Sequence, residues 1–274
     1  MTTHNIGFIG GGNMASALIG RLAGTLIEPS RIHVVDINAD KGRALSRQWG
    51  VSTATHADAQ LANCDVCVLA VKPQHARTAI PDLLPCIGSQ LILSVVAGIA
   101  TTDLSRWLNG HTAIVRTMPN TPALVGQGVT GMFAMDGTED AQRRIADEIM
   151  RSVGQTFWVE KESDLNSVTA VSGSGPAYVF YFIEALQEAG MALGLDEKQA
   201  ADMALATFRG AALLADQSGE PASVLREQVT SPGGTTFAAL TTMETGKLKA
   251  LVAKAVKAAS DRSVELGIAF GQEA

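Results

Sequence analysis

Charged residues are scarce in this chain, and no run of basic residues appears anywhere in it. Only 18% of its 274 residues are charged, and the formal net charge is −6. A nucleic-acid-binding protein needs a basic patch, so we expect no nucleic-acid partner. The hydrophobic fraction of 46% is high for a soluble protein and indicates surface that is buried between subunits.

Long hydrophobic runs are missing as well. No apolar stretch is long enough to span a membrane, and residues 1–5 have neither the basic nor the long apolar region of a signal peptide. We therefore expect a cytoplasmic protein without a membrane partner.

Cysteine and histidine are too few and too scattered for a disulfide framework or a metal site. The sequence has three cysteines and five histidines, and the histidines share no metal-ligand spacing. Cys64 and Cys67 form a CxxC pair that leads directly into an apolar strand, where alternation sends the two sulfur atoms to different environments. We interpret both as buried thiols and expect no metal. No Ser-His-Asp or Cys-His arrangement for nucleophilic catalysis is evident either.

A glycine-rich turn near the start of the chain is the first feature with chemical meaning. An apolar strand over residues 6–9 runs into Gly10-Gly11-Gly12, and a helical pattern follows at once. Gly10 permits the sharp turn, and Gly12 has no side chain to keep a pyrophosphate from the backbone. The free N–H groups of the helix then face the phosphates. A second strand, over residues 32–36, ends in Asp36 at the distance expected for a ribose contact, so the pattern predicts a dinucleotide site.

Strands and helices alternate through the first 160 residues, which implies a parallel, doubly wound sheet of the Rossmann type. The third predicted strand ends just before Lys72 and Pro73, and the fourth, over residues 91–98, ends in small residues that leave room for a flat ring. Because parallel strands end on the ligand side of such a sheet, Lys72 can meet a phosphate, a ribose or a substrate carboxylate. Residues 119–122, with a proline at each end, predict an extended loop at the same edge.

The pattern changes after residue 165, where apolar positions recur only at helical spacing. We predict a nucleotide-binding domain over residues 1–160 and an all-helical domain for substrate binding and dimerisation over residues 161–274. Two islands of glycine and serine interrupt the helices, at residues 171–178 and 230–236. The backbone amides of Gly233–Thr236 would form a nest at a helix start, suited to an anion as small as a carboxylate.

Five motifs, in order along the chain, carry a resemblance to a known family. They are Gly10-Gly11-Gly12-Asn13-Met14, Ala70-Val71-Lys72-Pro73, Met118-Pro119-Asn120-Thr121-Pro122, Ser172-Gly173-Ser174-Gly175-Pro176-Ala177-Tyr178 and Ser231-Pro232-Gly233-Gly234-Thr235-Thr236. With them the chain closely resembles pyrroline-5-carboxylate reductase over essentially its whole length. The resemblance implies the last step of proline synthesis, in which NADPH or NADH reduces L-1-pyrroline-5-carboxylate to L-proline. It also implies an interlocked homodimer of the helical domains, and it allows dimers to assemble into a decamer.

The resemblance assigns roles to individual residues. It implies that the cofactor phosphates lie on Ile9, Gly10, Gly11, Gly12, Asn13 and Met14. The nicotinamide side is walled by Ala70, Val71, Lys72, Pro73, Val95, Val96 and Ala97. The substrate-binding residues are Ser231, Gly233, Gly234, Thr235 and Thr236, and the amides of this turn hold the substrate carboxylate. The Thr236 hydroxyl lies beside the ring nitrogen and helps to deliver its proton.

The preference between the two cofactors stays open. Asp36 would accept hydrogen bonds from an adenosine ribose and repel a 2′-phosphate, which favours NADH, whereas many members of the family have small polar or basic residues there. No arginine lies in residues 36–40, although Lys41 and Arg43 are near.

Two other functions compete with this interpretation. A 3-hydroxyacid dehydrogenase of the phosphogluconate-related kind also joins a nucleotide domain to a helical one, but its catalytic lysine and asparagine would fall on Val179 and Phe182. A non-catalytic NAD(P)H sensor would keep the first glycine turn, but it would have no reason to keep both later islands.

Overall fold

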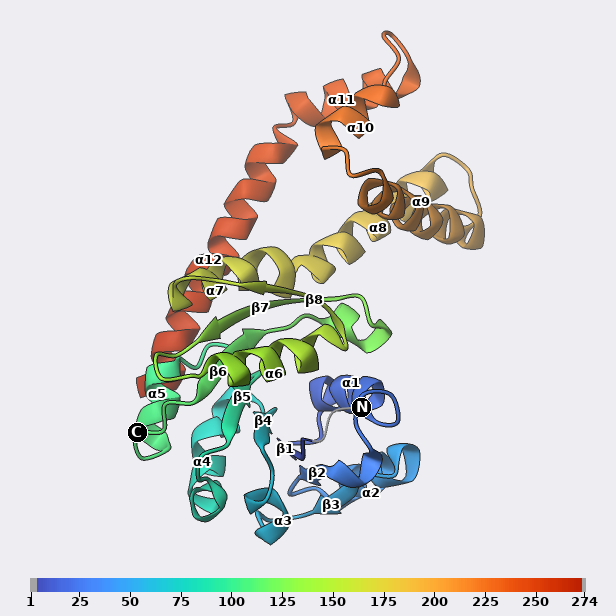
Figure 1. Cartoon of the computed structure of the whole chain (residues 1–274). Helices are drawn as coiled ribbons and strands as arrows, with labels where there is room; N and C mark the ends of the chain where they lie inside the picture. The colour runs from blue at the N-terminus through green and yellow to red at the C-terminus, as the bar shows by residue number, and fades with distance from the viewer. Residues whose placement is uncertain (1–3, 273–274) are drawn as a thin grey trace. The chain divides into compact units, whose positions relative to one another are not determined.

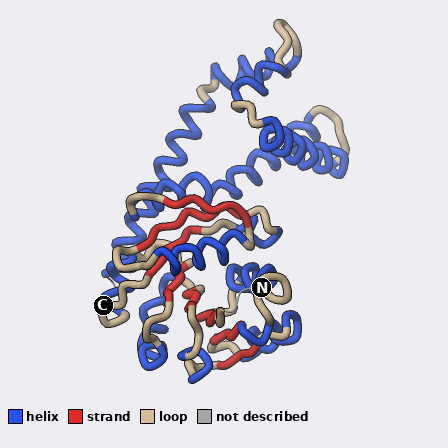
Figure 2. Tube along the Cα trace, viewed as in Figure 1, coloured by secondary structure: helices blue, strands red, loops and turns tan. Residues whose placement is uncertain are grey.

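The computed structural model describes residues 4–272, which form two compact units. The first unit contains the residues up to Ser174 together with those from Ala259 onward, and the second contains Gly175–Ala258. All strands of the described residues lie in the first unit, as the red segments of Figure 2 show, whereas the second unit is helical. The predicted fold class, a Rossmann-type domain followed by a helical region, is therefore confirmed.

An eight-stranded sheet forms the centre of the first unit (Figure 1). Its strands are β1 (Ile6–Ile9), β2 (Ile32–Val35), β3 (Ser52–Ala54), β4 (Val66–Leu69), β5 (Leu91–Ser94), β6 (Ile114–Met118), β7 (Gly128–Ala134) and β8 (Gly154–Trp158). Their order is β3-β2-β1-β4-β5-β6-β7-β8, and all neighbours are parallel except β6 and β7. The chain builds outward from β1 to β3 and then crosses to β4 on the other side of β1. The strand order therefore switches between β1 and β4, which is where such sheets bind ligands.

Helices cover both faces of this sheet. One face carries α1 (Asn13–Leu22), α2 (Ala39–Trp49) and α6 (Asp140–Arg151), and the other carries α3 (Ala59–Ala62), α4 (Pro73–Leu83) and α5 (Thr101–Trp107). Side chains alternate between two apolar clusters, so that Ile6 and Phe8 of β1 join the first cluster and Ile9 joins the second. Burial on both faces explains why the central strands are continuous hydrophobic runs in the sequence.

Local signals fix the helix ends near the ligand edge. At the start of α2, the Asn38 side-chain oxygen accepts hydrogen bonds from the N–H groups of Asp40 and Lys41, and Gly50 ends the helix in the left-handed conformation. Pro73 occupies the first position of α4, where its missing N–H costs nothing. Helices α2 and α4 therefore begin where these local sequence signals lie.

Three details of the first unit differ from the sequence expectation. Strand β3 was not predicted, because its three residues, Ser52–Ala54, form only a short edge strand and lack an apolar pattern. The strand β7 runs antiparallel to β6, a reversal inside an otherwise parallel sheet. The loop after β6 is extended only through Asn120, because a 3₁₀ turn over Thr121–Val125 follows, with Pro122 in its first turn.

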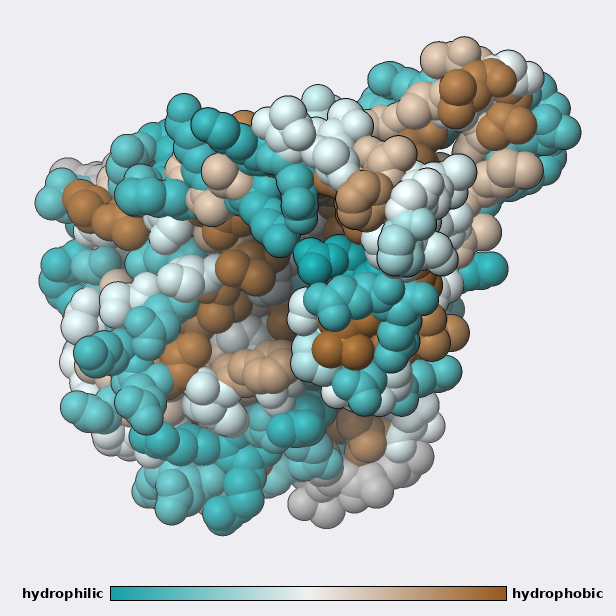
Figure 3. All heavy atoms as spheres, turned by 90° about the horizontal axis from the view of Figure 1, so that it is seen from above, coloured by the Kyte–Doolittle hydropathy of each residue, from teal (hydrophilic) through white to brown (hydrophobic). Residues whose placement is uncertain are grey.

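The second unit contains α8 (Gly175–Ala192), α9 (Glu197–Ser218), α10 (Ala222–Gln228), α11 (Thr235–Thr245) and the first part of α12 (Leu248–Gln272). Helix α8 is rich in apolar residues yet has no buried residue, and Phe180 and Tyr181 are 65% and 71% exposed. Figure 3 shows hydrophobic side chains at the molecular surface. Helix α8 packs against α9, yet large apolar side chains remain exposed on it, and such an exposed apolar face marks a protein–protein interface. Within residues 4–272, no helix has the length and apolarity that crossing a membrane requires.

The buried side chain of His33 lies beside a serine and an aspartate, Ser52 and Asp58, that are distant from it in the sequence. His33 of β2 is 2% exposed, and its Nδ1 lies 2.9 Å from Ser52 Oγ. Its Nε2 lies 3.2 Å from Asp58 Oδ1 without making a well-directed hydrogen bond. The Ser52 hydroxyl also donates to Ile32 O, and Gln60 Nε2 donates to the hydroxyl. This group joins β2 to β3 and is structural, so the expectation that no Ser-His-Asp arrangement serves nucleophilic catalysis stays a prediction.

Protonation of His33 is expected to destabilise the fold. Burial lowers the pKa of His33 below its ordinary 6.5, and the neighbouring Asp58 carboxylate only partly opposes this. The unfolded chain therefore binds a proton that the folded chain does not bind, and the free energy of unfolding falls as the pH drops from about 7 to about 5. Urea unfolding across this range measures the slope. His33→Gln is expected to flatten it, whereas His56→Gln, at an exposed position, is expected to leave it unchanged.

Candidate active site

The glycine turn lies between the ends of β1, β2 and β4. Gly10 has a φ of +95°, its N–H donates to Val35 O at 2.8 Å, and a β-carbon on it would lie 2.7 Å from Ala70 O. Only glycine fits this position, because both the backbone conformation and the close approach exclude a side chain. The turn is thus anchored on both sides of the switch in strand order.

Helix α1 begins directly after this turn with an uncapped N-terminus. Gly12 is the N-cap residue, with φ −76° and no side-chain hydrogen bond to the first turn. No acidic residue lies in that first turn, so no side chain of the helix neutralises the positive end of its dipole. Amides of this kind bind phosphate oxygens without a charged side chain. A β-carbon on Gly12 would have Ala70 O, at 4.0 Å, as its nearest neighbour, so a ligand can approach the backbone here.

Asp36 lies at the end of β2, beside the glycine turn. Its Oδ2 accepts a hydrogen bond from Gly11 N–H at 2.7 Å, and its Oδ1 accepts one from Asn38 N–H at 2.8 Å. The two amides hold the carboxylate in one orientation. Arg43 pairs with Asp40 rather than with Asp36. The negative charge at this edge therefore has two backbone donors and no arginine partner among the described contacts.

The loops after β4 and β5 lie next to the glycine turn. Ala70 N–H donates to Ile9 O at 2.8 Å, and Val95 N–H donates to Leu69 O at 3.0 Å, so the three strand ends are in register. Lys72 is exposed and forms no ion pair within residues 4–272. Ala97 is exposed, but Val96 is 1% exposed and lies in the core. Val96 can therefore reach a ligand only through its backbone.

The predicted substrate turn lies in the second unit. Gly233 has a φ of +71°, and Gly234 is the uncapped N-cap residue of α11. Gly234 N–H already donates to Ser231 O at 3.0 Å. The amides of Thr235 and Thr236, in the first turn of α11, have no acceptor within their own helix. These two amides are the donors that the turn can offer to a small anion, and the half-buried Thr236 side chain lies beside them.

Asn120 and a buried ion pair are features that the sequence left unassigned. Asn120 Oδ1 accepts from Val129 N–H at 2.8 Å and Nδ2 donates to Ser172 O at 2.9 Å, so the amide joins two motifs instead of facing a ligand. Arg116 Nη1 donates to Glu162 Oε1 at 2.9 Å, and both side chains are largely buried. An arginine inside an apolar strand is a signal that a buried acid must exist, but the sequence does not say which one.

The cysteines take no part in this site. Burial raises the pKa of the Cys64 thiol to about 11 and that of Cys67 to about 12, so both stay protonated at neutral pH. All three cysteines are free, and the prediction of buried thiols at Cys64 and Cys67 is confirmed. In the part of the chain that the structure describes, no cluster of His, Cys, Asp and Glu is arranged to hold a metal ion.

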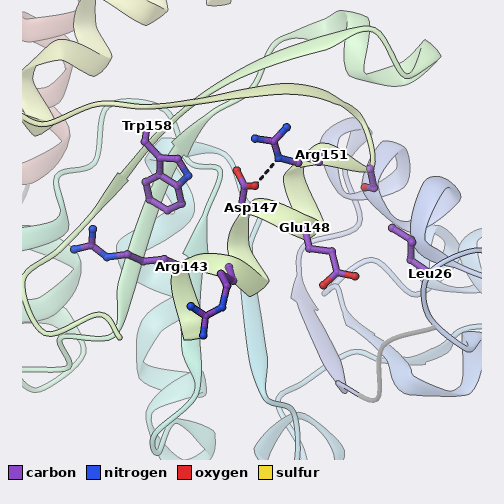
Figure 4. Close-up of a pocket in the computed structure, with 8 residues that line it drawn as sticks. Leu26, Arg143, Asp147, Glu148, Arg151 and Trp158 are labelled. Carbon is purple, nitrogen blue, oxygen red and sulfur yellow. Dashed lines mark hydrogen bonds and ion pairs between the residues drawn. The ribbon is translucent and has the colours of Figure 1, made fainter. Parts of the chain in front are cut away.

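A pocket of about 660 Å³ lies on α6 and β8, away from the predicted site residues (Figure 4). It is lined by Leu26, Arg143, Arg144, Asp147, Glu148, Arg151, Ser152 and Trp158. Burial opposes ionisation of Asp147, but hydrogen bonds from Arg151, Thr156 and Trp158 outweigh it and lower the pKa of this carboxyl. Because its neighbours already satisfy Asp147, we assign it a structural role.

Comparison with known proteins decides the family. Residues 162–266 match the family model for pyrroline-5-carboxylate reductase dimerisation, and residues 5–98 match the model for NADP oxidoreductase, coenzyme F420-dependent. Pyrroline-5-carboxylate reductase from Pseudomonas aeruginosa is 40% identical over 273 residues, which is 99% of this chain and 100% of that protein. The chain belongs to the pyrroline-5-carboxylate reductase family.

Solved structures of this family agree. A pyrroline-5-carboxylate reductase from Coxiella burnetii matches with a TM-score of 0.92 and 40% identity, over 97% of this chain and 99% of that one. The Plasmodium falciparum pyrroline carboxylate reductase, solved with NADP bound, matches with a TM-score of 0.84 and 30% identity, over 97% and 99% of the two chains. The predicted family and its NAD(P)H-dependent oxidoreductase class are confirmed, and the dimerisation model supports self-association. The family assignment decides against the hydroxyacid dehydrogenase alternative.

Replacing Gly12 by valine is expected to weaken NAD(P)H binding at least about tenfold while leaving the fold intact. The φ of Gly12 suits any residue, and a β-carbon there meets no protein atom closer than 4.0 Å. The new side chain would therefore obstruct the pyrophosphate and not the protein. Fluorescence titration with NADH and thermal melting measure the two effects. Gly10→Ala is the matched control, because its β-carbon would strike Ala70 O and lower the melting temperature. If Gly12→Val binds NADH as tightly as the wild type, the cofactor phosphates do not bind at this turn.

Proposed function

We propose that this chain reduces L-1-pyrroline-5-carboxylate to L-proline with NADPH or NADH, the last step of proline biosynthesis. The observation that carries the proposal is the 40% identity to a reductase of that name along 99% of the chain. Two uncapped helix starts among the described residues support it, one at Gly12 for the cofactor phosphates and one at Gly234 for a carboxylate.

The cofactor fits the residues at the ligand edge of the sheet. The turn from Ile9 to Met14 would hold the phosphates, and Asp36 would meet the adenosine ribose. The loops at residues 70–73 and 95–97 would wall the nicotinamide, with Lys72 as the nearby cation. When bound, the reduced nicotinamide supplies a hydride to the imine carbon. The chain's own residues bind, align and exclude water, so no side-chain nucleophile is needed.

The turn over residues 231–236 would hold the substrate in the second unit. Ser231 and Gly233 shape the turn, and the amides of Thr235 and Thr236 would bind the carboxylate. The Thr236 hydroxyl would donate a hydrogen bond to the ring nitrogen and help a proton reach it, directly or through water. The reduction then adds one hydride at carbon and one proton at nitrogen.

We also propose a domain boundary, a larger assembly and a cellular location for this chain. We place the boundary between the nucleotide-binding and helical domains after residue 160, which agrees with the start of the matched dimerisation segment at residue 162. Residues 161–174 nevertheless pack with the first compact unit. A decamer built from dimers rests on the family resemblance alone. A cytoplasmic location, without nucleic-acid or membrane partners, rests on composition and charge.

We expect NADH to be the better cofactor, by about tenfold in kcat/KM, because the fixed Asp36 carboxylate would repel a 2′-phosphate. Absorbance of NADH and NADPH, followed with pyrroline-5-carboxylate present, measures both the activity and the preference. Asp36→Ser is expected to raise the rate with NADPH, and Asp40→Ser, at the exposed carboxylate that pairs with Arg43, is the control. A strong preference for NADPH in the unaltered protein would contradict the ribose contact. Oxidation of neither cofactor would favour the sensor.

Removing the Thr236 hydroxyl is expected to lower kcat/KM about a hundredfold, the scale of general acid–base assistance. Steady-state kinetics of Thr236→Ala measure this, and Thr236→Ser is expected to restore most of the loss. Thr241→Ala is the control, because that hydroxyl lies on the same helix and donates to Phe237 O at 2.8 Å. Unchanged turnover in Thr236→Ala, with NADH binding intact, would show that the hydroxyl takes no part in the reaction.

A further inference from the structure

The loop between β5 and α5, residues 95–100, is contacted by segments that are distant in the sequence. It follows Ser94, contains Gly98 at a φ of +82°, and leads to Thr101, the first residue of α5. Surface loops are mobile by default unless other segments fix them. Two distant parts of the chain hold this loop from within the first unit, one at Gly98 inside the loop and one at Thr101, directly after it.

The first contact is made by Glu162. Its Oε1 accepts from Thr101 N–H at 2.7 Å and from Arg116 Nη1 at 2.9 Å, and its Oε2 accepts from Thr101 Oγ1 at 2.8 Å. Helix α5 has no side-chain cap of its own, so this carboxylate replaces the cap at the positive end of the helix. Thr101 is 2% exposed and Arg116 is 7% exposed. The buried network therefore fixes the start of α5 against β6.

The second contact is made by the last turns of α12. A β-carbon on Gly98 would lie 3.4 Å from Phe270 Cδ2 and 3.6 Å from Gly267 Cα, and one on Gly267 would lie 3.0 Å from Gly98 O. The two glycines thus let the helix backbone approach the loop backbone closely. Phe270 packs on the same core cluster as Val96 and Ile99, on either side of Gly98.

Polar contacts also join α12 to α5 and to Asn166. Arg106 of α5 donates to Gly271 O at 3.0 Å and to Asp103 Oδ1 at 2.7 Å. Ser263 Oγ donates to Asn166 Oδ1 at 2.8 Å, and Ser263 is only 8% exposed. The matched dimerisation segment ends at residue 266, so residues 267–272 lie beyond it. The match to the dimerisation model therefore does not explain why the end of α12 packs on the β5–α5 loop.

We propose that Glu162 and Phe270 are positioning residues for hydride transfer, which hold the β5–α5 loop where it walls the nicotinamide. The inference rests on the proposed function, because that function places residues 95–97 beside the nicotinamide. Hydride transfer requires the reacting carbons to be about 3–3.5 Å apart, so a loop that shifts by a fraction of that distance slows the step. Neither residue is among those that the proposed function places against the cofactor or the substrate, and both act through the loop.

Hydrogen exchange tests the hold itself, in the protein without cofactor. Thr101→Val removes the hydroxyl that donates to Glu162, and Thr101→Ser keeps it. Phe270→Ala removes the packing on Gly98, and Phe270→Leu keeps most of it. We expect faster amide exchange across residues 95–103 in the valine and alanine variants, and wild-type exchange in the serine and leucine variants. Unchanged exchange in both disruptive variants would overturn the proposal.

Kinetics test the consequence of the hold for hydride transfer. In Thr101→Val and Phe270→Ala we expect kcat to fall about tenfold and the isotope effect from NADH deuterated at C4 to rise, while the dissociation constant of ADP-ribose stays unchanged. A variant that is merely less stable would lose active protein without changing the isotope effect, and that result would overturn the proposal. If Phe270→Ala does not fold, Thr101→Val decides alone. Turnover by the wild type reports on the proposed function, and the variant-to-wild-type ratio reports on the loop.

Discussion

The ligand edge of the sheet depends on one close approach, that of the Gly10 backbone to the carbonyl of Ala70. A β-carbon at Gly10 would come within 2.7 Å of that oxygen, so the ends of β1 and β4 can meet only because the side chain is absent. This contact spans the switch in strand order. The first turn of α1, the Asp36 carboxylate and the loop at Ala70 therefore lie side by side at this switch.

Backbone amides would do most of the anion binding that the proposed reaction needs. Both candidate anion sites are helix starts without a side-chain cap, at Gly12 in the first unit and Gly234 in the second. A chain with a net charge of −6 can thus bind a dinucleotide and a carboxylate without a basic patch. Charged side chains have a supporting role. Glu162 caps α5 and neutralises Arg116 in the core, which fixes the loop beside the proposed nicotinamide position.

The predictable parts of the fold are those with local causes. The Gly10 turn, the Asn38 cap and Pro73 at a helix start each depend on residues a few positions apart, and the Gly10 turn lies where the pattern predicts it. Strand β3 escaped prediction because Ser52–Ala54, three small residues at a sheet edge, have no periodic signal. The roles of Asn120 and Glu162 escaped because their partners are 52 and 61 residues away in the chain. Separations of this size have no sequence pattern.

The sequence by itself determined the family and the class of reaction through the resemblance that five motifs carry. It also determined the two glycine turns, because their physical requirements are local: a conformation that only glycine adopts easily, or a helix start with open amides. The tertiary structure decided how distant segments hold those turns. The pairing of His33 with Ser52, the buried Arg116–Glu162 pair and the packing of Phe270 on the β5–α5 loop exist only once the sheet has formed, because burial creates the need for partners that the linear chain does not reveal.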